Sequence, residues 1–137
     1  MAYWLLKTEP EEYSWDRLVR DGKGGWDGVR NHTAARNLRA MKKGDRAFFY
    51  HTGDEKRIVG MCEIVREAYP DKSDPAGKFV MVDVKPVRPA KTPVTLAEIK
   101  ADKRFADFVL VRQARLSVMP VPPEHWKTIC KRAGLDT

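Results

Sequence analysis

The stretch from Trp26 to Thr52 constrains the fold of this 137-residue chain more than any other part of the sequence. Near its end, the turn signal Gly44-Asp45 precedes Arg46–His51, an aromatic run that is too short for a helix and rich in strand formers. We therefore expect a buried strand in the middle of a sheet. At its start, Trp26 stands among glycines outside any periodic pattern. This predicts a loop whose indole is free of the core and open to solvent.

The rest of the chain predicts further strands around this central one. The five expected strands are Tyr3–Thr8, Arg46–His51, Arg57–Glu67, Lys78–Val87 and Leu116–Val121. The second and third are separated by a short polar turn, which predicts a hairpin. We expect Pro86, Pro89 and Pro93 to end the fourth strand, because proline cannot donate a hydrogen bond to a ladder.

Capping residues mark the expected helices. Ser14, Asn31 and Thr95 each precede an apolar pattern at helical spacing, and Pro122-Pro123 opens a last helix. Hairpins in the middle, with helices at both ends of the chain, predict an α+β fold. A mainly antiparallel sheet of about five to six strands must curl into a partial barrel to close over its aromatic face, which leaves a concave mouth near the loops. The length fits a single domain, residues 1–137.

Charge narrows the choice of partner. Lys and Arg total 26 against 19 Asp and Glu, a formal net charge of +7, and the excess leans towards residues 90–137. Such an excess suits a polyanion or an anionic membrane surface, although a solvated surface without a partner explains it too. Lys103, Arg104, Arg112 and Arg115 lie among aromatic and apolar residues, a pattern typical of a phosphate-facing edge. Alternatively, these long side chains cover apolar surface while their charges stay in water.

Cysteine spacing and hydropathy bear on the cellular compartment. Cys62 and Cys130 have no histidine spacing that suggests zinc, so both are expected to be reduced core thiols. The apolar run at the N-terminus is too short for a signal peptide, and the sequence has no apolar stretch of bilayer length. We expect a soluble, intracellular, cytoplasmic protein with no membrane partner, no metal and no cofactor. The sequence does not specify an oligomeric state.

Ordered blocks along nearly the whole chain resemble the EVE domain family, a branch of the PUA-like group that also includes YTH and ASCH domains. These blocks are Lys7-Thr8-Glu9-Pro10, Tyr13-Ser14-Trp15, Trp26-Asp27-Gly28-Val29-Arg30-Asn31, Phe48-Phe49-Tyr50-His51-Thr52, Ile58-Val59-Gly60, Tyr69-Pro70-Asp71 and residues 110–121. Thr8 and Thr52 stand where serine is usual, and Phe79 stands where a tryptophan is often found. The resemblance implies a PUA-like partial barrel with a pocket for a modified nucleobase, such as 5-methyl- or 5-hydroxymethyl-cytosine.

The same resemblance aligns Trp26 with an aromatic-cage tryptophan of YTH readers. A flipped or single-stranded base would stack on this ring while polar groups read its edge. The residues expected to contact the base are Trp26, Asn31, His51, Thr52, Ser14, Ser117 and Met119. Those expected to face phosphates or other parts of the nucleic acid, DNA or RNA, are Arg30, Lys103, Arg104, Arg112 and Arg115.

Several of these side chains have a structural alternative. Asn31 can serve only as a helix cap, Arg30 can form a plain surface salt bridge, and a lone histidine such as His51 is often a hydrogen-bonded structural residue. Ser14, Ser117 and Met119 are included by resemblance more than by spacing.

Two other classes of function compete with a non-catalytic reader. ASCH-type folds include amidohydrolases that use a lysine, a threonine and a carboxylate, and Lys7, Thr8 and Glu9 have those types. On a regular strand Thr8 faces away from both neighbours, so a common site would require irregular backbone. A protein-interaction module is the third class.

Overall fold

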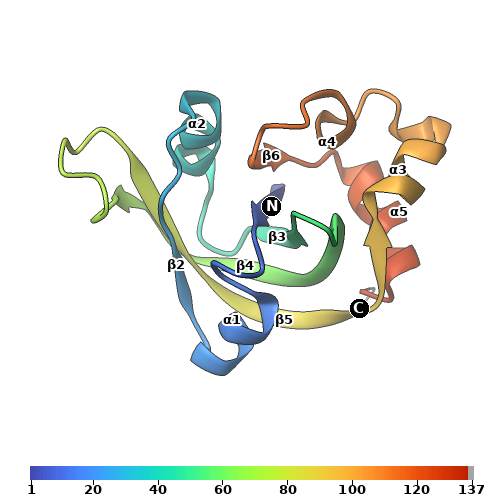
Figure 1. Cartoon of the computed structure of the whole chain (residues 1–137), viewed down its shortest axis with the longest axis horizontal. Coiled ribbons are helices and arrows are strands. Elements are labelled where there is room, and N and C mark those ends of the chain that lie inside the picture. Colours follow the sequence, from blue (N-terminus) through green and yellow to red (C-terminus); the bar gives the residue numbers. More distant parts are fainter. Residues whose placement is uncertain (136–137) are drawn as a thin grey trace.

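The computed structural model describes residues 1–135 and contains one curled sheet with helices at its ends and flanks (Figure 1). The strands are β1 (Tyr3–Thr8), β2 (Gly24–Trp26), β3 (Arg46–His51), β4 (Arg57–Pro70), β5 (Val80–Thr95) and β6 (Val118–Pro120). The helices are α1 (Trp15–Asp21), α2 (His32–Ala40), α3 (Leu96–Ala101), the 3-10 helix η1 (Lys103–Phe105), α4 (Val109–Arg112) and α5 (Pro123–Ala133).

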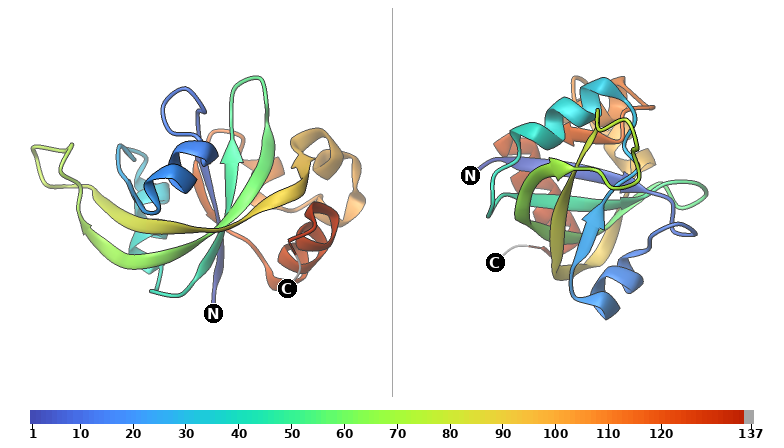
Figure 2. Two further views of the ribbon diagram at one scale, coloured as in Figure 1. Left: turned by 90° about the horizontal axis from the view of Figure 1, so that it is seen from below. Right: turned by 90° about the vertical axis from the view of Figure 1, so that its left-hand side faces the viewer.

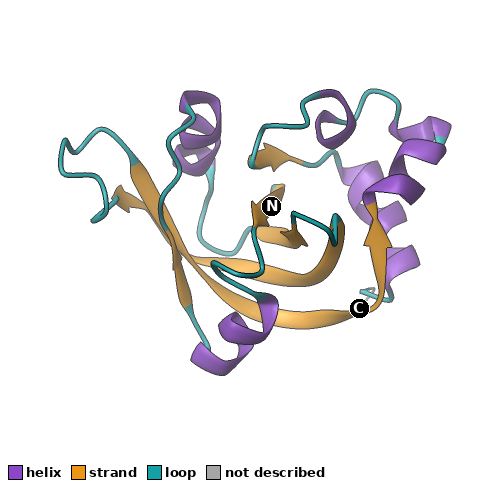
Figure 3. Cartoon of the chain, in the orientation of Figure 1, coloured by secondary structure: helices purple, strands orange, loops and turns teal. Residues whose placement is uncertain are grey.

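The six strands form one sheet in the order β2-β5-β4-β3-β1-β6. All neighbours are antiparallel except β1 and β3, which pair in parallel across the long connection that contains α1, β2 and α2. The long strands β4 and β5 curve around the other strands (Figure 2), and α3, α4 and α5 gather at one end of the sheet (Figure 3). The predicted α+β fold with a curled, mainly antiparallel sheet is confirmed.

Strand β3 occupies the middle of the sheet, as predicted from its aromatic run. It pairs with β4 on one side and with β1 on the other. Its residues from Ala47 to His51 are all buried, and Phe48 and Phe49 have no exposed surface. The expected hairpin between β3 and β4 is present, with a register shift between Phe49 and Tyr50. Strand β3 therefore lies at the centre of the sheet, between β1 and β4.

The predicted end of the fourth strand was wrong. Strand β5 continues through Pro86, Pro89 and Pro93 to Thr95. Strand β2 covers β5 only at residues 82–84, so β5 is an edge strand beyond that point, and an edge position does not require the missing N–H of proline. Register shifts in the pairing with β4 accompany these residues.

The glycine-rich segment that we expected to be a loop contains strand β2. Gly25 pairs with Asp83 and Trp26 with Val82. The glycines make room for side chains of other elements, because a Cβ at Gly24 would lie 2.1 Å from the Tyr13 hydroxyl oxygen and one at Gly25 would lie 2.4 Å from the Met81 methyl carbon. Close packing, rather than loop flexibility, explains these two glycines.

The helix caps were predicted correctly. The side chains of Ser14, Asn31 and Thr95 accept hydrogen bonds from the backbone at the starts of α1, α2 and α3. The indole of Trp15 lies over Gly60, where a Cβ would come within 2.7 Å of the ring, so Gly60 allows a helix to pack on the sheet.

Trp126 and the two cysteines lie in the core. The ring of Trp126 stacks on Tyr3 and Phe48 at centroid distances of 4.4 and 4.0 Å. Cys62 and Cys130 are buried free thiols, as expected. Burial raises the pKa of Cys62 to about 12, so this thiol is not poised for thiolate chemistry.

Candidate binding cleft

A cleft of about 690 Å³ opens between the end of β1, the start of α1 and the backbone that follows β2. Its lining residues are Lys7, Thr8, Glu9, Glu12, Tyr13, Arg17, Gly24, Gly25, Trp26, Asp27, Gly28, Val29, Arg30, Thr52 and Ser117. The lining combines aromatic rings, hydroxyl groups and charges of both signs. A cleft of this size can hold a flat heterocycle of nucleobase size.

Trp26 forms one wall of the cleft, but its indole is not free. Only 6% of the residue is exposed. Tyr13 and Phe49 pack on it nearly perpendicular, with centroids 6.2 and 5.3 Å away. The predicted open ring is therefore wrong, because strand pairing with Val82 and contact with Phe49 draw Trp26 into the core. Only a small part of the indole reaches the cleft.

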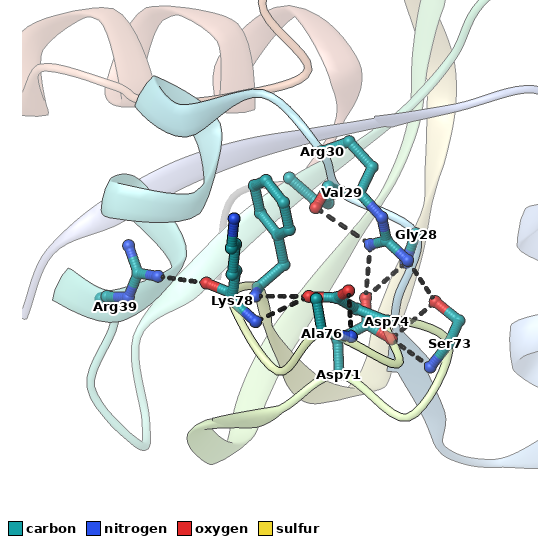
Figure 4. Close-up of polar contacts among 10 residues, drawn as sticks. Gly28, Val29, Arg30, Arg39, Asp71, Ser73, Asp74, Ala76 and Lys78 are labelled. Atoms are coloured by element: carbon teal, nitrogen blue, oxygen red, sulfur yellow. Dashed lines mark hydrogen bonds and ion pairs between the residues drawn. The ribbon is translucent and has the colours of Figure 1, made fainter.

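The backbone after Trp26 is held by Asp71, whose carboxylate is buried (Figure 4). Asp71 Oδ2 accepts hydrogen bonds from the Gly28 N–H at 2.8 Å and from Arg30 Nη1 at 3.1 Å. Oδ1 accepts from the N–H and hydroxyl groups of Ser73. Burial alone would raise the pKa of Asp71, but the hydrogen bonds from Ser73, Gly28 and Arg30 outweigh it and lower the pKa to about 2.

Arg30 therefore makes an ion pair and also lines the cleft. Besides Asp71, its Nη2 donates to the Ser73 hydroxyl at 2.9 Å. Its guanidinium also lies 5.4 Å from the Phe79 ring centroid. The loop that carries these partners is closed by Asp74, which accepts backbone hydrogen bonds from Ala76, Lys78 and Phe79 (Figure 4). Arg30 is thus held in place at the rim.

Lys7 brings a positive charge to the cleft from β1. Its Nζ donates to the Ala114 carbonyl oxygen at 3.0 Å and lies 5.6 Å from the Tyr50 ring centroid. Partial burial lowers the pKa of Lys7. Lys7, Thr8 and Glu9 all line the cleft, contrary to the expectation that regular strand geometry would separate them. The strand ends at Thr8, and the chain turns at Glu9, whose carbonyl accepts the Tyr13 N–H.

Tyr13 places a hydroxyl group without a hydrogen-bond partner beside the cleft. Within residues 1–135, no group pairs with its buried oxygen, which lies against Gly24. The ring packs on Trp26 and lies 5.3 Å from the Arg17 guanidinium carbon. An unpaired buried hydroxyl costs roughly 1–3 kcal/mol of folding free energy.

We expect Tyr13→Phe to raise the free energy of unfolding by about 1 kcal/mol, because it removes the unpaired hydroxyl and keeps the ring. Tyr69→Phe is the matched control. The Tyr69 hydroxyl donates to the buried Asp83 carboxylate at 2.5 Å, so its loss should destabilise the fold by about 1–3 kcal/mol. Urea unfolding measures both. A destabilised Tyr13→Phe variant would show that the hydroxyl has a partner in solution.

Four of the side chains predicted from the sequence line the cleft, namely Trp26, Arg30, Thr52 and Ser117. Ser14, Asn31, His51 and Met119 lie outside it. Ser14 caps α1 by accepting the Arg17 N–H, and Met119 is fully buried in β6. Asn31 accepts the Ala34 N–H at 2.9 Å and borders a separate cavity of about 270 Å³. The structure therefore shows Asn31 as a helix cap and not as a residue of the cleft.

His51 was expected at the mouth but is a buried structural residue. Its Nε2 accepts the Trp15 N–H at 3.1 Å, and its Nδ1 lies 3.0 Å from Glu55 Oε1. A neutral ring with the proton on Nδ1 satisfies both contacts. His51 therefore connects the start of α1 to the turn after β3 instead of reaching a ligand.

The basic residues predicted near the C-terminal third also lie outside the cleft. Arg104 pairs with Asp102 and Arg112 pairs with Asp107, both at the surface. Lys103 is exposed, and Arg115 borders the same small cavity as Asn31. The sequence did not predict that Tyr13 and Arg17 line the cleft, although Tyr13 belongs to the Tyr13-Ser14-Trp15 block that resembles the family. The helical spacing that begins at Trp15 suggested core packing alone.

The curled six-stranded half-barrel, with this cleft beside the parallel β1–β3 pair, defines a PUA-like domain. The YTH domain of Zygosaccharomyces rouxii MRB1 protein, solved in complex with N6-methyladenosine RNA, shares the fold at a TM-score of 0.61 and 16% sequence identity, covering 98% of this chain and 91% of that chain. The chain belongs to the EVE domain family, whose model matches residues 2–132.

Closer relatives support this assignment. Rpa0253 from Rhodopseudomonas palustris has a TM-score of 0.93 and 54% identity, covering 100% of this chain and 96% of that chain. Human thymocyte nuclear protein 1 is 36% identical, covering 91% of this chain and 71% of that protein. The crystal structure of human THYN1 protein in complex with 5-methylcytosine containing DNA has a TM-score of 0.90 and 33% identity, covering 100% of both chains.

Within residues 1–135, no helix is both long and apolar enough to cross a bilayer. The described residues also contain no cluster of histidine, cysteine and acidic side chains suited to hold a metal ion.

Proposed function

We propose that this EVE domain is a non-catalytic nucleic-acid-binding module that recognises a modified nucleobase, such as 5-methyl- or 5-hydroxymethyl-cytosine, in the cleft walled by Trp26. The observation that carries the proposal is the cleft itself, which combines an indole, free hydroxyl groups and an anchored arginine in a volume of about 690 Å³. The relative human THYN1, solved with 5-methylcytosine containing DNA, supports the choice of ligand.

In this proposal, the base enters the cleft and contacts the accessible part of Trp26 and the backbone of Gly24–Gly28. The Thr52 and Ser117 hydroxyl groups, together with the Lys7 ammonium, offer hydrogen bonds to its polar edge. Arg30 stands at the rim, where its remaining donors can meet a phosphate. A protein recognises such a flipped base by the shape of the base and by hydrogen bonds to its polar edge.

A base-modifying enzyme is the second candidate, and one observation favours it. Lys7, Thr8 and Glu9 line the same cleft, and partial burial lowers the pKa of Lys7, which makes its neutral amine more accessible as a base or nucleophile. An amidohydrolase of the ASCH type would use these groups on a modified base or nucleoside. A reader releases its ligand chemically unchanged, whereas an enzyme alters it, so chemical analysis of the recovered ligand distinguishes the two candidates.

We expect the protein to bind a 5-methylcytosine oligonucleotide about fourfold more tightly than the cytosine version, since a buried methyl group contributes roughly 0.8 kcal/mol. Fluorescence titration at fixed salt, with DNA and RNA oligonucleotides in parallel, measures this ratio. Mass spectrometry of the recovered ligand should show an unchanged base. Equal affinity for both oligonucleotides would refute the reader, and an altered base would establish the enzyme.

A nucleic-acid ligand fits the expectation that the protein acts inside the cell. The cytoplasm remains the predicted location. A protein-interaction module would bind neither oligonucleotide with a preference, so the same titration tests that third class.

A further inference from the structure

A second cleft, of about 480 Å³, lies between η1 and α5 and is almost entirely basic. Its lining residues are Arg104, Lys127, Thr128, Lys131 and Arg132. Four of the five carry a positive charge at neutral pH. The four residues of α5 have the spacing of one helix face, so the helix presents its charges together.

Asp102 orients the two arginines of this basic cleft. Its carboxylate accepts hydrogen bonds from Arg104 Nη2 at 2.8 Å and from Arg132 Nη2. Only 15% of the Asp102 side chain is exposed. One carboxylate therefore faces two guanidinium groups, which leaves an excess of positive charge and fixes the direction of the remaining N–H donors. Planar guanidinium groups held in this way suit the oxygens of a phosphate group.

The two lysines of the basic cleft lack such a partner. Neither Lys127 nor Lys131 makes an ion pair within the described part of the chain. They are four residues apart on α5, where like charges repel and destabilise a helix. The helix dipole favours a cation at Lys131, in the last turn, but not at Lys127, in the middle of the helix. A bound anion would relieve this repulsion.

We propose that the basic cleft binds phosphate groups of the same nucleic-acid strand whose base occupies the cleft at Trp26. The identification of the ligand as a nucleic-acid strand rests on the proposed function. The two clefts are built from different elements, and α5 lies apart from α1 and β2 in both Figure 1 and Figure 2. A strand of several nucleotides is the ligand that spans them, because it carries regularly spaced phosphates away from the bound base.

The test is the salt dependence of oligonucleotide binding by the double variant Lys127→Gln, Lys131→Gln. Both side chains are exposed, so the fold should be retained. If each lysine meets one phosphate, the slope of log affinity against log salt falls in magnitude by about 1.8 on duplex DNA or about 1.4 on a single strand. The matched control is Lys42→Gln, Lys43→Gln, which removes the same charge from exposed positions outside both clefts and should leave the slope unchanged.

Ligand length gives an independent readout. A single modified nucleoside should bind the double variant and the natural protein equally, whereas a 12-nucleotide strand should bind the variant less tightly. The preference for the modified base should not change, because neither lysine lines the first cleft. If modified and unmodified strands bind alike but the slope still falls, the proposed function fails and the phosphate contact stands.

A slope in the double variant equal to that of the natural protein would overturn the inference. Binding of free pyrophosphate by the natural protein and by the double variant then shows what the basic cleft binds instead. If pyrophosphate binding depends on Lys127 and Lys131 while the slope is unchanged, the basic cleft belongs to a small phosphate compound and not to a strand.

Discussion

Trp26→Ala is expected to lower the free energy of unfolding by about 3–5 kcal/mol, the usual cost of truncating a buried tryptophan. It should also abolish the preference for a modified base, because it removes one wall of the cleft. The first effect follows from the 6% exposure of Trp26 and its contacts with Tyr13 and Phe49. Urea unfolding measures the stability, and titration under conditions where the variant is folded measures the preference.

The two effects must be separated, because an unfolded variant binds nothing. Trp126→Ala is the matched control. Trp126 is also 6% exposed and packs on two aromatic rings, but it lies outside the cleft. This variant should lose comparable stability and keep the ratio of affinities for modified and unmodified strands. If Trp26→Ala is folded and keeps that ratio, Trp26 does not contact the base.

Asp71→Ala is expected to destabilise the protein by about 3–5 kcal/mol, because it leaves Arg30 and three further donors without their buried acceptor. The backbone at Gly28 should lose its position, so binding in the cleft should weaken as well. Asp107→Ala is the control. Asp107 pairs with Arg112, and the side chain of Asp107 is 93% exposed. Removing this carboxylate should therefore change the free energy of unfolding by no more than about 0.5 kcal/mol.

The pKa of Asp71 gives this prediction a pH dependence. Folding lowers the pKa from 3.8 to about 2, so the carboxylate stabilises the folded state above the unfolded pKa. This contribution, roughly 2 kcal/mol, is lost as the pH falls from about 4 to about 2. The stability difference between the natural protein and Asp71→Asn should shrink over this window, as measured by urea unfolding at each pH. A constant difference would show that Asp71 does not titrate as described.

Local signals in the sequence predicted the elements well. The caps at Ser14, Asn31 and Thr95 were correct because a capping hydrogen bond involves residues only three positions apart. The central strand was correct because the aromatic run within Arg46–His51 is rich in strand formers and too short for a helix. The path of β5 was not predictable in the same way, since its tolerance of prolines depends on where β2 stops covering it.

The site was predicted less completely than the fold. Trp26, Arg30, Thr52 and Ser117 do meet at one cleft, which the resemblance to the family anticipated. His51 has the structural role that was its alternative, and its contact with Trp15 could not be predicted from sequence spacing, because the two residues are brought together by folding. Arg104 was expected to face phosphates, but its grouping with α5 was not predicted, since Arg104 contacts that helix through Asp102 and His125 only in the folded chain.

Composition, capping residues and apolar runs were enough to specify most of the helices and strands, that the sheet is mostly antiparallel, and that the surface is basic. They could not specify how far Trp26 is buried or which charges gather in one cleft. Those properties depend on contacts between residues distant in the chain, such as Trp26 with Val82 and Arg30 with Asp71. Solvent exposure and ion pairing are set by such neighbours, so only the folded chain determines them.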